Sequence, residues 1–216
     1  MSTPKSILGW WFSKSDGLPY NDGRRIVVGE TLHVDGEIMP CERGLHLSEH
    51  LIDALQYAPG PILWRVEGSG TVVPHGNPVD KYACSDRKAL WMIDATPVLR
   101  RFARACALDV IHQWAAPDIV IRYLATGDES IRAAARDVAW AAARDVAWAA
   151  AWAAARAAAM AAVDAAMDAA WAAACTAAWA ARKRHGKILT EMIEQYRAGT
   201  LDLDAPLPIP NKEASE

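Results

Sequence analysis

The stretch that decides the fold runs from Arg24 to Gly60, "RRIVVGETLHVDGEIMPCERGLHLSEHLIDALQYAPG". Its first half sets β-branched runs between glycines, a pattern typical of short strands joined by tight turns. Asp35 and Gly36 predict a hairpin within "HVDGEIM", because such turns need a positive φ that these two residue types tolerate. This half therefore predicts strands.

The second half of the stretch predicts one helix. In "SEHLIDALQYAPG", Ser48 suits the N-cap, the apolar residues that follow supply a buried side, and Pro59 ends the helix. The later segments "PILWRVEGSGTVV" and "ALWMID" predict further strands. Because the glycine-rich "GSGTVVPHG" leads into a strand and not a helix, it does not suit a phosphate-binding loop.

The composition changes sharply near residue 95, where a glycine-containing, β-branched sequence gives way to a helical one. Three regions are predicted: a mixed domain over residues 1–95, a helical region over 96–198, and a flexible proline-rich tail over 199–216. The fold class is therefore α+β, a small strand-rich domain followed by an all-α region rich in alanine and tryptophan.

Start and stop signals divide the helical region. A threonine-proline start at Thr96 predicts a helix that ends before Pro117. A shorter helix follows and closes at Gly127, which suits a left-handed stop. Thr126 and Glu129 have the spacing of a capping box, in which each side chain satisfies a backbone N–H near the other.

An alanine-rich tract spans residues 130–185 and contains "AAARDVAWAAARDVAW", one block written twice. No glycine or proline interrupts it before Gly186, where the basic run "ARKRHGK" favours a helix end. Large side chains recur mostly every four residues, so their row winds around a straight helix. The tract is therefore either one bent or paired helix or several short ones.

Tryptophan supplies most of the apolar area of this tract, about 150–250 Å² for each side chain, while alanine lets helices approach closely. We expect these side chains to be buried, within the chain or against a protein partner that can be a second copy. The predicted interaction surface comprises Trp140, Trp148, Trp152, Trp171 and Trp179.

The bulk composition argues against several classes of protein. A formal net charge of -3 gives no basic footprint, so nucleic acid is not an expected partner. The four cysteines are far apart, which fits a reduced cytoplasmic setting and neither a disulfide scaffold nor a zinc knuckle. Charges interrupt the alanine tract and the N-terminus lacks signal-peptide features, so no membrane segment is expected.

The best catalytic candidates lie in "CERGLHLSEH", where His46 and Ser48 alternate along a strand end and so point the same way. Nucleophilic catalysis needs a base within hydrogen-bond reach of a serine or cysteine, and sequence alone does not place such a set. The simpler interpretation makes Ser48 a helix cap and His46 a partly buried histidine. No metal site is expected, although His46 and His50 are four residues apart.

Two features of the first hundred residues resemble a small domain family of unknown function found in phages, prophages and bacteria. One is the spacing from Cys41 to Gly44-Leu45-His46, and the other is the helix "DALQY" that follows. The chain departs from the family pattern at Ser48, where a cysteine is common. The alanine-rich part is similar to extensions of such domains and to repeats in immunity proteins. This resemblance implies a phage context and no established activity.

The stretch "GLHLSEHLIDALQYAPGPILWRVEGSG" is also similar to a part of RNA 2′-phosphotransferases, which have the ADP-ribosyltransferase fold and bind NAD. This resemblance implies a site around His46 and Ser48, with Tyr57 and Arg65 as further candidates and NAD as the cofactor. The upstream motif "LRH" of that family is missing, which leaves the positioning of a substrate in doubt.

The leading hypothesis from the sequence is a non-enzymatic accessory protein of a phage or prophage, without a cofactor, that binds a host or defence protein in the bacterial cytoplasm. The alternative is an NAD-using enzyme related to ADP-ribosyltransferases. A second alternative is a structural protein that assembles through its helices.

Overall fold

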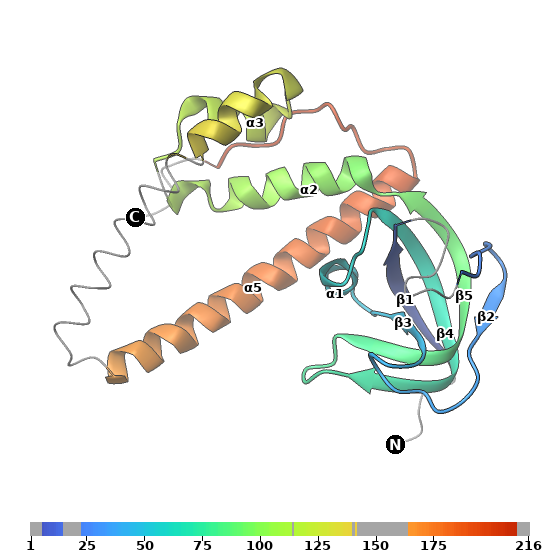
Figure 1. Ribbon diagram of the computed structural model, residues 1–216. Coiled ribbons are helices and arrows are strands. Elements are labelled where there is room, and N and C mark those ends of the chain that lie inside the picture. Colours follow the sequence, from blue (N-terminus) through green and yellow to red (C-terminus); the bar gives the residue numbers. More distant parts are fainter. Residues whose placement is uncertain (1–5, 15–22, 114, 140, 142–163, 211–216) are drawn as a thin grey trace. The chain divides into compact units, whose positions relative to one another are not determined.

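The computed structural model describes residues 6–14, 23–113, 115–139, 141 and 164–210, with the backbone alone for Gln113 and for 164–179 (Figure 1). It confirms the α+β class, with an antiparallel five-stranded sheet and several helices. The chain divides into two compact units, residues 1–99 with 184–201 and residues 100–183 with 202–216. This grouping differs from a linear division at residue 95, because a distant segment joins the first unit.

The sheet of the first unit is ordered β1-β4-β5-β2, and β3 also pairs with β5. Two long strands, β4 (Ile62–His75) and β5 (Lys81–Asp94), form its centre. β1 (Ser6–Ser13) pairs with β4, while β2 (Thr31–His33) and β3 (Leu45–Leu47) pair with different halves of β5. Sequence reasoning missed β1, but the predicted strand "PILWRVEGSGTVV" corresponds to most of β4, which continues through a bulge.

A backbone bridge between Trp10 and Ser48 closes part of this sheet into a ring. The Trp10 N–H donates to the Ser48 carbonyl at 2.8 Å, and the Ser48 N–H donates back at 3.0 Å. Because Ser48 follows β3 directly, the bridge connects β3 to β1 and completes the circuit β1-β4-β5-β3. The ring forms around a core to which Leu45, Leu47, Trp64, Val66 and Cys84 belong.

Leu47 occupies the space that two glycines leave free inside this ring. A Cβ added to Gly68 would lie 2.4 Å from Leu47 Cδ2, and one added to Gly9 would lie 2.5 Å from Leu47 Cδ1. Leu47 is 2% exposed, so neither methyl group can move toward solvent. The glycines therefore let β3 approach the β1-β4 pair closely.

The predicted helix and hairpin are corrected in detail. Helix α1 spans Leu51–Gln56 with His50 at the N-cap, so Ser48 is not the cap; its backbone is engaged by Trp10 instead. Gly36 has the positive φ expected of it, 92°, but no hairpin forms there. The Val34 N–H donates to the Ser85 carbonyl, so the chain before the turn pairs with β5.

The helix end predicted at Gly186 is wrong. Helix α5 spans Asp164–Arg197 and passes through this glycine without a break. A Cβ at Gly186 would lie 3.0 Å from Ile52 Cγ2, so the residue serves a close contact with α1 and not a helix stop. The chain turns with positive φ only after the helix, at Gly199, where φ is 70°.

The second unit contains most of α2 (Thr96–Asp109), α3 (Asp118–Thr126) and two short 3₁₀ turns, η1 (Ile111–Gln113) and η2 (Glu129–Ile131). The predicted helix start at Thr96 is confirmed.

The left-handed stop of α3 is also confirmed, with φ 72° at Gly127. The capping box is wrong, since the Asp128 side chain accepts from the Ser130 N–H and caps η2, while the Thr126 hydroxyl donates back to the Arg122 carbonyl. Local side chains thus form hydrogen bonds with backbone groups here, but the pairs are not those of the predicted capping box.

The described part of the predicted flexible tail makes specific contacts within the second unit. Arg101, which is buried, donates to the carbonyls of Leu203 and Ala205, at 3.2 and 2.6 Å. The Leu207 N–H donates to the Ala125 carbonyl at 2.8 Å. Residues 203–207 are therefore linked to α2 and α3 by hydrogen bonds, and the mobility expected of the tail stays a prediction.

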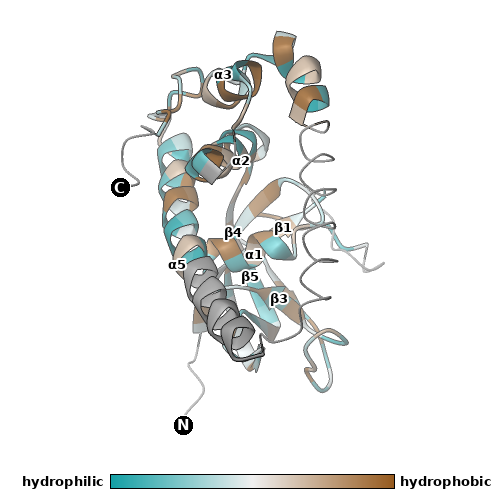
Figure 2. Ribbon diagram, turned by 90° about the vertical axis from the view of Figure 1, so that its left-hand side faces the viewer, coloured by the Kyte–Doolittle hydropathy of each residue, from teal (hydrophilic) through white to brown (hydrophobic). Residues whose placement is uncertain are grey.

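The predicted tryptophan surface lies mostly beyond what the structure describes. Trp140, Trp148 and Trp152 fall outside the described residues, and Trp171 and Trp179 lie on α5 where the backbone alone is described. The prediction of one long helix or several short ones for residues 130–185 also depends on residues outside the described part of the chain. Among the described helices none is long and apolar enough to cross a membrane, and the coloured helices in Figure 2 mix hydrophilic and hydrophobic positions.

We predict that Gly68→Ala lowers the free energy of unfolding by about 2 kcal/mol, because the new methyl group overlaps Leu47. In a double-mutant cycle the added Leu47→Ala change should relieve this overlap, so that the double variant loses less than the sum of the single losses. Urea denaturation of the four proteins measures both quantities. Additive losses would contradict the proposed overlap.

Candidate ligand-binding site

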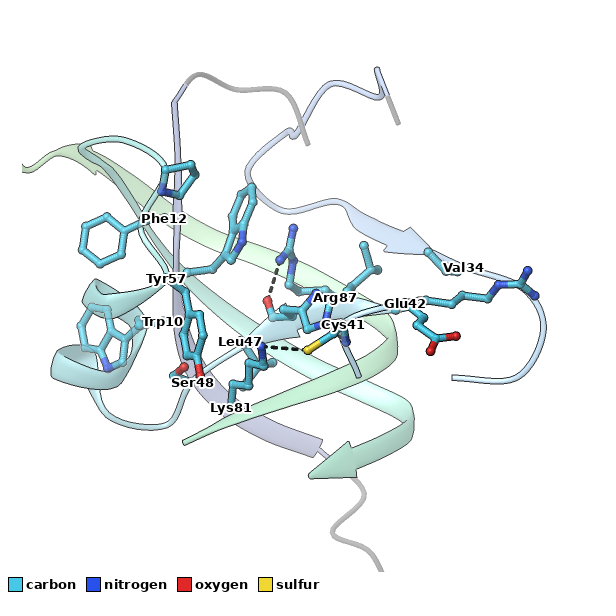
Figure 3. A pocket seen from close by; sticks show the side chains of 17 residues that line it. Trp10, Phe12, Val34, Cys41, Glu42, Leu47, Ser48, Tyr57, Lys81 and Arg87 are labelled. Atoms are coloured by element: carbon cyan, nitrogen blue, oxygen red, sulfur yellow. Dashed lines mark hydrogen bonds between the residues drawn. The ribbon is translucent and has the colours of Figure 1, made fainter. Parts of the chain in front are cut away.

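A cavity of about 570 Å³ lies in the first unit beside the bridge that joins β1 to β3 (Figure 3). Its volume is in the range of sites for small organic ligands. Its lining residues are Trp10, Trp11, Phe12, Val34, Cys41, Glu42, Arg43, Gly44, Leu45, His46, Leu47, Ser48, Ala54, Tyr57, Pro59, Lys81 and Arg87.

A tight turn before β3 shapes one side of the cavity. The Met39 carbonyl accepts from the N–H groups of Glu42 and Arg43, and the Arg43 carbonyl accepts from the Met39 N–H. Cys41, within this turn, has a φ of 72°, a conformation that is uncommon for any residue with a side chain. The turn brings Cys41 and Arg43 to the cavity that His46 also lines.

Arg87 places a fixed positive charge in the cavity lining. The residue is 3% exposed, and its Nη1 donates to the His46 carbonyl at 2.6 Å. Its guanidinium carbon lies 4.0 Å from the centroid of the Trp11 ring, within the range of a cation–π contact. A backbone carbonyl and an aromatic face thus hold the guanidinium group of Arg87 in the cavity lining.

His46 is a neutral side chain at physiological pH. Burial, followed by the positive charges of Lys81 and Arg87, lowers the pKa of His46 from 6.5 to about 4. Its Nε2 is 3.2 Å from the Cys41 backbone nitrogen, whose N–H donates to it, so the proton of the neutral ring is on Nδ1. With that lone pair occupied, His46 is poorly suited to act as a general base.

Lys81 provides a second positive charge, which lies beside a cysteine sulfur and an aromatic ring. Its Nζ donates to Cys41 Sγ at 3.3 Å and lies 4.1 Å from the centroid of the Tyr57 ring, and Figure 3 shows the first contact as a dashed line. Neither contact is with a carboxylate. Among the residues that the structure describes, no carboxylate lies within ion-pair distance of Lys81 Nζ.

Tyr57 is held in place by the turn between β4 and β5. Its hydroxyl donates to Asp80 at 2.5 Å, and this hydrogen bond is the main cause that raises the pKa of Tyr57 to about 12. Gln56 and His75 also contact the Asp80 carboxylate, at 3.1 and 3.2 Å. The phenol is therefore a fixed part of the lining and not a base.

The structure brings three of the four sequence candidates together. His46, Ser48 and Tyr57 line the same cavity, but Arg65 does not; it stacks over Trp10, with its guanidinium carbon 4.4 Å from the ring centroid. Sequence reasoning missed Lys81 and Arg87. A usable signal was present, because in "KYACSDRKAL" both occur at alternate positions with the buried Ala83 and Ser85.

Metal binding finds no support in the described part of the chain. No group of three or more histidine, cysteine or carboxylate side chains there could hold a metal ion. Among the described residues, Cys41, Cys84 and Cys106 form no disulfide, and burial raises the pKa of Cys84 to about 11.

Comparison with known families gives one match. Residues 15–101 match the model of a family described as Domain of unknown function (DUF7666). That span contains most of the cavity lining but not its β1 residues, 10–12, and not residues 184–201. No curated protein and no solved structure matches the chain.

We predict that His46 makes stability depend on pH below neutrality. The unfolded chain takes up a proton on this residue near pH 6.5 while the folded chain does so near pH 4, so the free energy of unfolding falls as the pH falls through that window. His46→Gln keeps an acceptor for the Cys41 N–H but does not titrate. Between pH 6.5 and 4 it should lose about 2 kcal/mol less than the parent protein, after allowance for partial exposure.

Urea denaturation at closely spaced pH values measures this difference. Parallel pH profiles for the two proteins would show that His46 titrates normally in the folded chain.

Proposed function

We propose that the first unit is a binding module for a small organic anion that carries an aromatic or apolar group. The observation that supports it is the combination, in one cavity, of the cations Lys81 and Arg87 with the aromatic side chains Trp11, Phe12 and Tyr57. Cations select the anionic group of a ligand, and flat apolar surfaces select its body.

The charges around the cavity favour an anion although the whole protein is acidic. Among the described residues, the lining contains Arg43, Lys81 and Arg87 against one carboxylate, Glu42, while the formal net charge of the chain is -3. The lowered pKa of His46 reports the same positive field, since Lys81 and Arg87 are among its causes. In a partly dry cavity such charges attract an anion more strongly than they would in water.

Several features favour binding over catalysis by the sequence candidates. The Nε2 of His46 accepts a backbone hydrogen bond, the Tyr57 hydroxyl donates to Asp80, and Arg65 lies outside the cavity. Nδ1–H of a neutral His46 is a donor that suits an acceptor atom of a ligand. NAD, the cofactor of the alternative hypothesis, combines anionic phosphates with aromatic rings and therefore belongs among the probes.

The interaction hypothesis for the tryptophans concerns three residues outside the described part of the chain and two whose backbone alone is described, and it stays a prediction. A phage context and a protein partner remain expectations from the resemblance.

We predict that phenyl phosphate, AMP and NAD bind the full chain while uncharged adenosine binds much more weakly, because adenosine cannot use the cations. Lys81→Gln should weaken binding of the anionic probes at least tenfold, on the order of 1.4 kcal/mol or more. Lys88→Gln is the matched control, since Lys88 is an exposed lysine of the same strand that does not line the cavity. Isothermal titration calorimetry at low and at high salt measures these affinities.

Binding should weaken as the salt concentration rises. Equal affinity for adenosine and AMP, or equal affinity of the Lys81→Gln and Lys88→Gln proteins, would overturn the proposal, as would the absence of binding by all three anions.

We further predict that a bound anion shields Cys41 from alkylation. Cys41 is exposed and its thiol lies beside Lys81, whereas Cys84 is buried. With saturating phenyl phosphate, iodoacetamide should modify Cys41 several times more slowly, as followed by mass spectrometry of the peptide that contains it. An unchanged rate at saturation would place the anion elsewhere.

A further inference from the structure

We infer that residues 184–201, the last part of α5 and the turn after it, position two sides of the cavity and are required for tight ligand binding. The inference rests on the proposed binding function. It concerns a segment outside residues 15–101, which match the family model, but inside the same compact unit as the cavity.

The first contact runs from α5 to α1. Gly186 approaches Ile52 so closely that an added Cβ would lie 3.0 Å from Cγ2 and 3.3 Å from Cβ of the isoleucine. Ile52 lies on α1, and Ala54 and Tyr57 at the end of the same helix line the cavity. A shift of α1 away from α5 would therefore move the cavity lining.

The second contact runs from α5 to β1 through stacked side chains. The guanidinium carbon of Arg197 lies 4.5 Å from the centroid of the Trp91 ring, and Trp91 packs edge-on against Trp10 with 5.7 Å between centroids. Trp10 lines the cavity and also forms the backbone bridge to Ser48. Arg65 stacks on Trp10; burial lowers the pKa of Arg65, and the charge of Glu194 on α5 acts in the opposite direction.

A single stripe of α5 joins these two contacts. Gly186, Leu189, Ile193 and Arg197 follow one another at intervals of three and four residues, which places them on one face of the helix. Leu189 and Ile193, between the two contacts, are both 0% exposed. The helix is thus fixed at both ends of this stripe, and each end supports a different side of the cavity.

Gly186→Leu tests the inference, with Lys187→Leu as the matched control. Both changes place leucine at neighbouring positions of one helix, but only the first meets Ile52; the side chain of Lys187 is 80% exposed and forms a long ion pair of 3.8 Å with Glu191. By calorimetry with phenyl phosphate on the full chain, we expect Gly186→Leu to raise the Kd at least fivefold and Lys187→Leu to change it less than twofold. Circular dichroism should show unchanged helix content.

Equal Kd values for the parent and the Gly186→Leu protein would overturn the inference. Should the parent bind no anion, the proposed function fails, and amide hydrogen exchange of Leu51–Gln56 decides the inference by itself. Faster exchange is expected in Gly186→Leu than in Lys187→Leu, and equal protection would overturn it.

Arg197→Ala is a milder second variant for the case that Gly186→Leu does not fold. It removes the cation over Trp91 at a position where the side chain is 49% exposed, and it should raise the Kd about threefold. An unchanged Kd in this variant would remove the β1 contact from the inference.

Discussion

The pairing of Trp10 with Ser48 is the constraint on which the first unit depends. Two backbone hydrogen bonds join the first strand to the end of β3, and this closes β1, β4, β5 and β3 into a ring. Closure forces Leu47, the neighbour of Ser48, into the space above Gly9 and Gly68. The cavity is lined by residues on both sides of the same bridge, so one pairing produces both the dry core and the site beside it.

Closing a small ring around a cavity also explains the electrostatics of the site. Arg87 is held within the lining by the His46 carbonyl and the Trp11 ring, because a buried cation needs partners. Its charge and that of Lys81, together with burial, keep His46 neutral. A histidine that stays neutral contributes a hydrogen-bond donor without adding a further positive charge to the cavity.

Much of the architecture could be predicted from the sequence, because strand patterns and helix stops are local. The α+β class and the left-handed stop at Gly127 are examples. Most failures share one cause, which is long-range contact; the capping box predicted at Thr126 is an exception, since its actual partners are local. Ser48 has the chemistry of a cap, but its backbone pairs with a strand that local patterns did not reveal. His46, Ser48 and Tyr57 meet in one cavity, whereas Lys81 and Arg87 join them only through the pairing of β3 with β5.

Gly186 shows how a residue that looks like a helix stop can serve the opposite purpose. Glycine in a helix interior costs about 1 kcal/mol relative to alanine, and this chain uses alanine at nearly every other small position of the preceding tract. Alanine would serve here as well if helix formation were the requirement. Its Cβ would approach the Ile52 side chain to 3.0 Å, so glycine allows the helix to pass closer to α1 than any other residue would. Glycine at position 186 lowers helix stability but allows α5 to contact α1. We therefore infer that this contact is the reason for a glycine at this position.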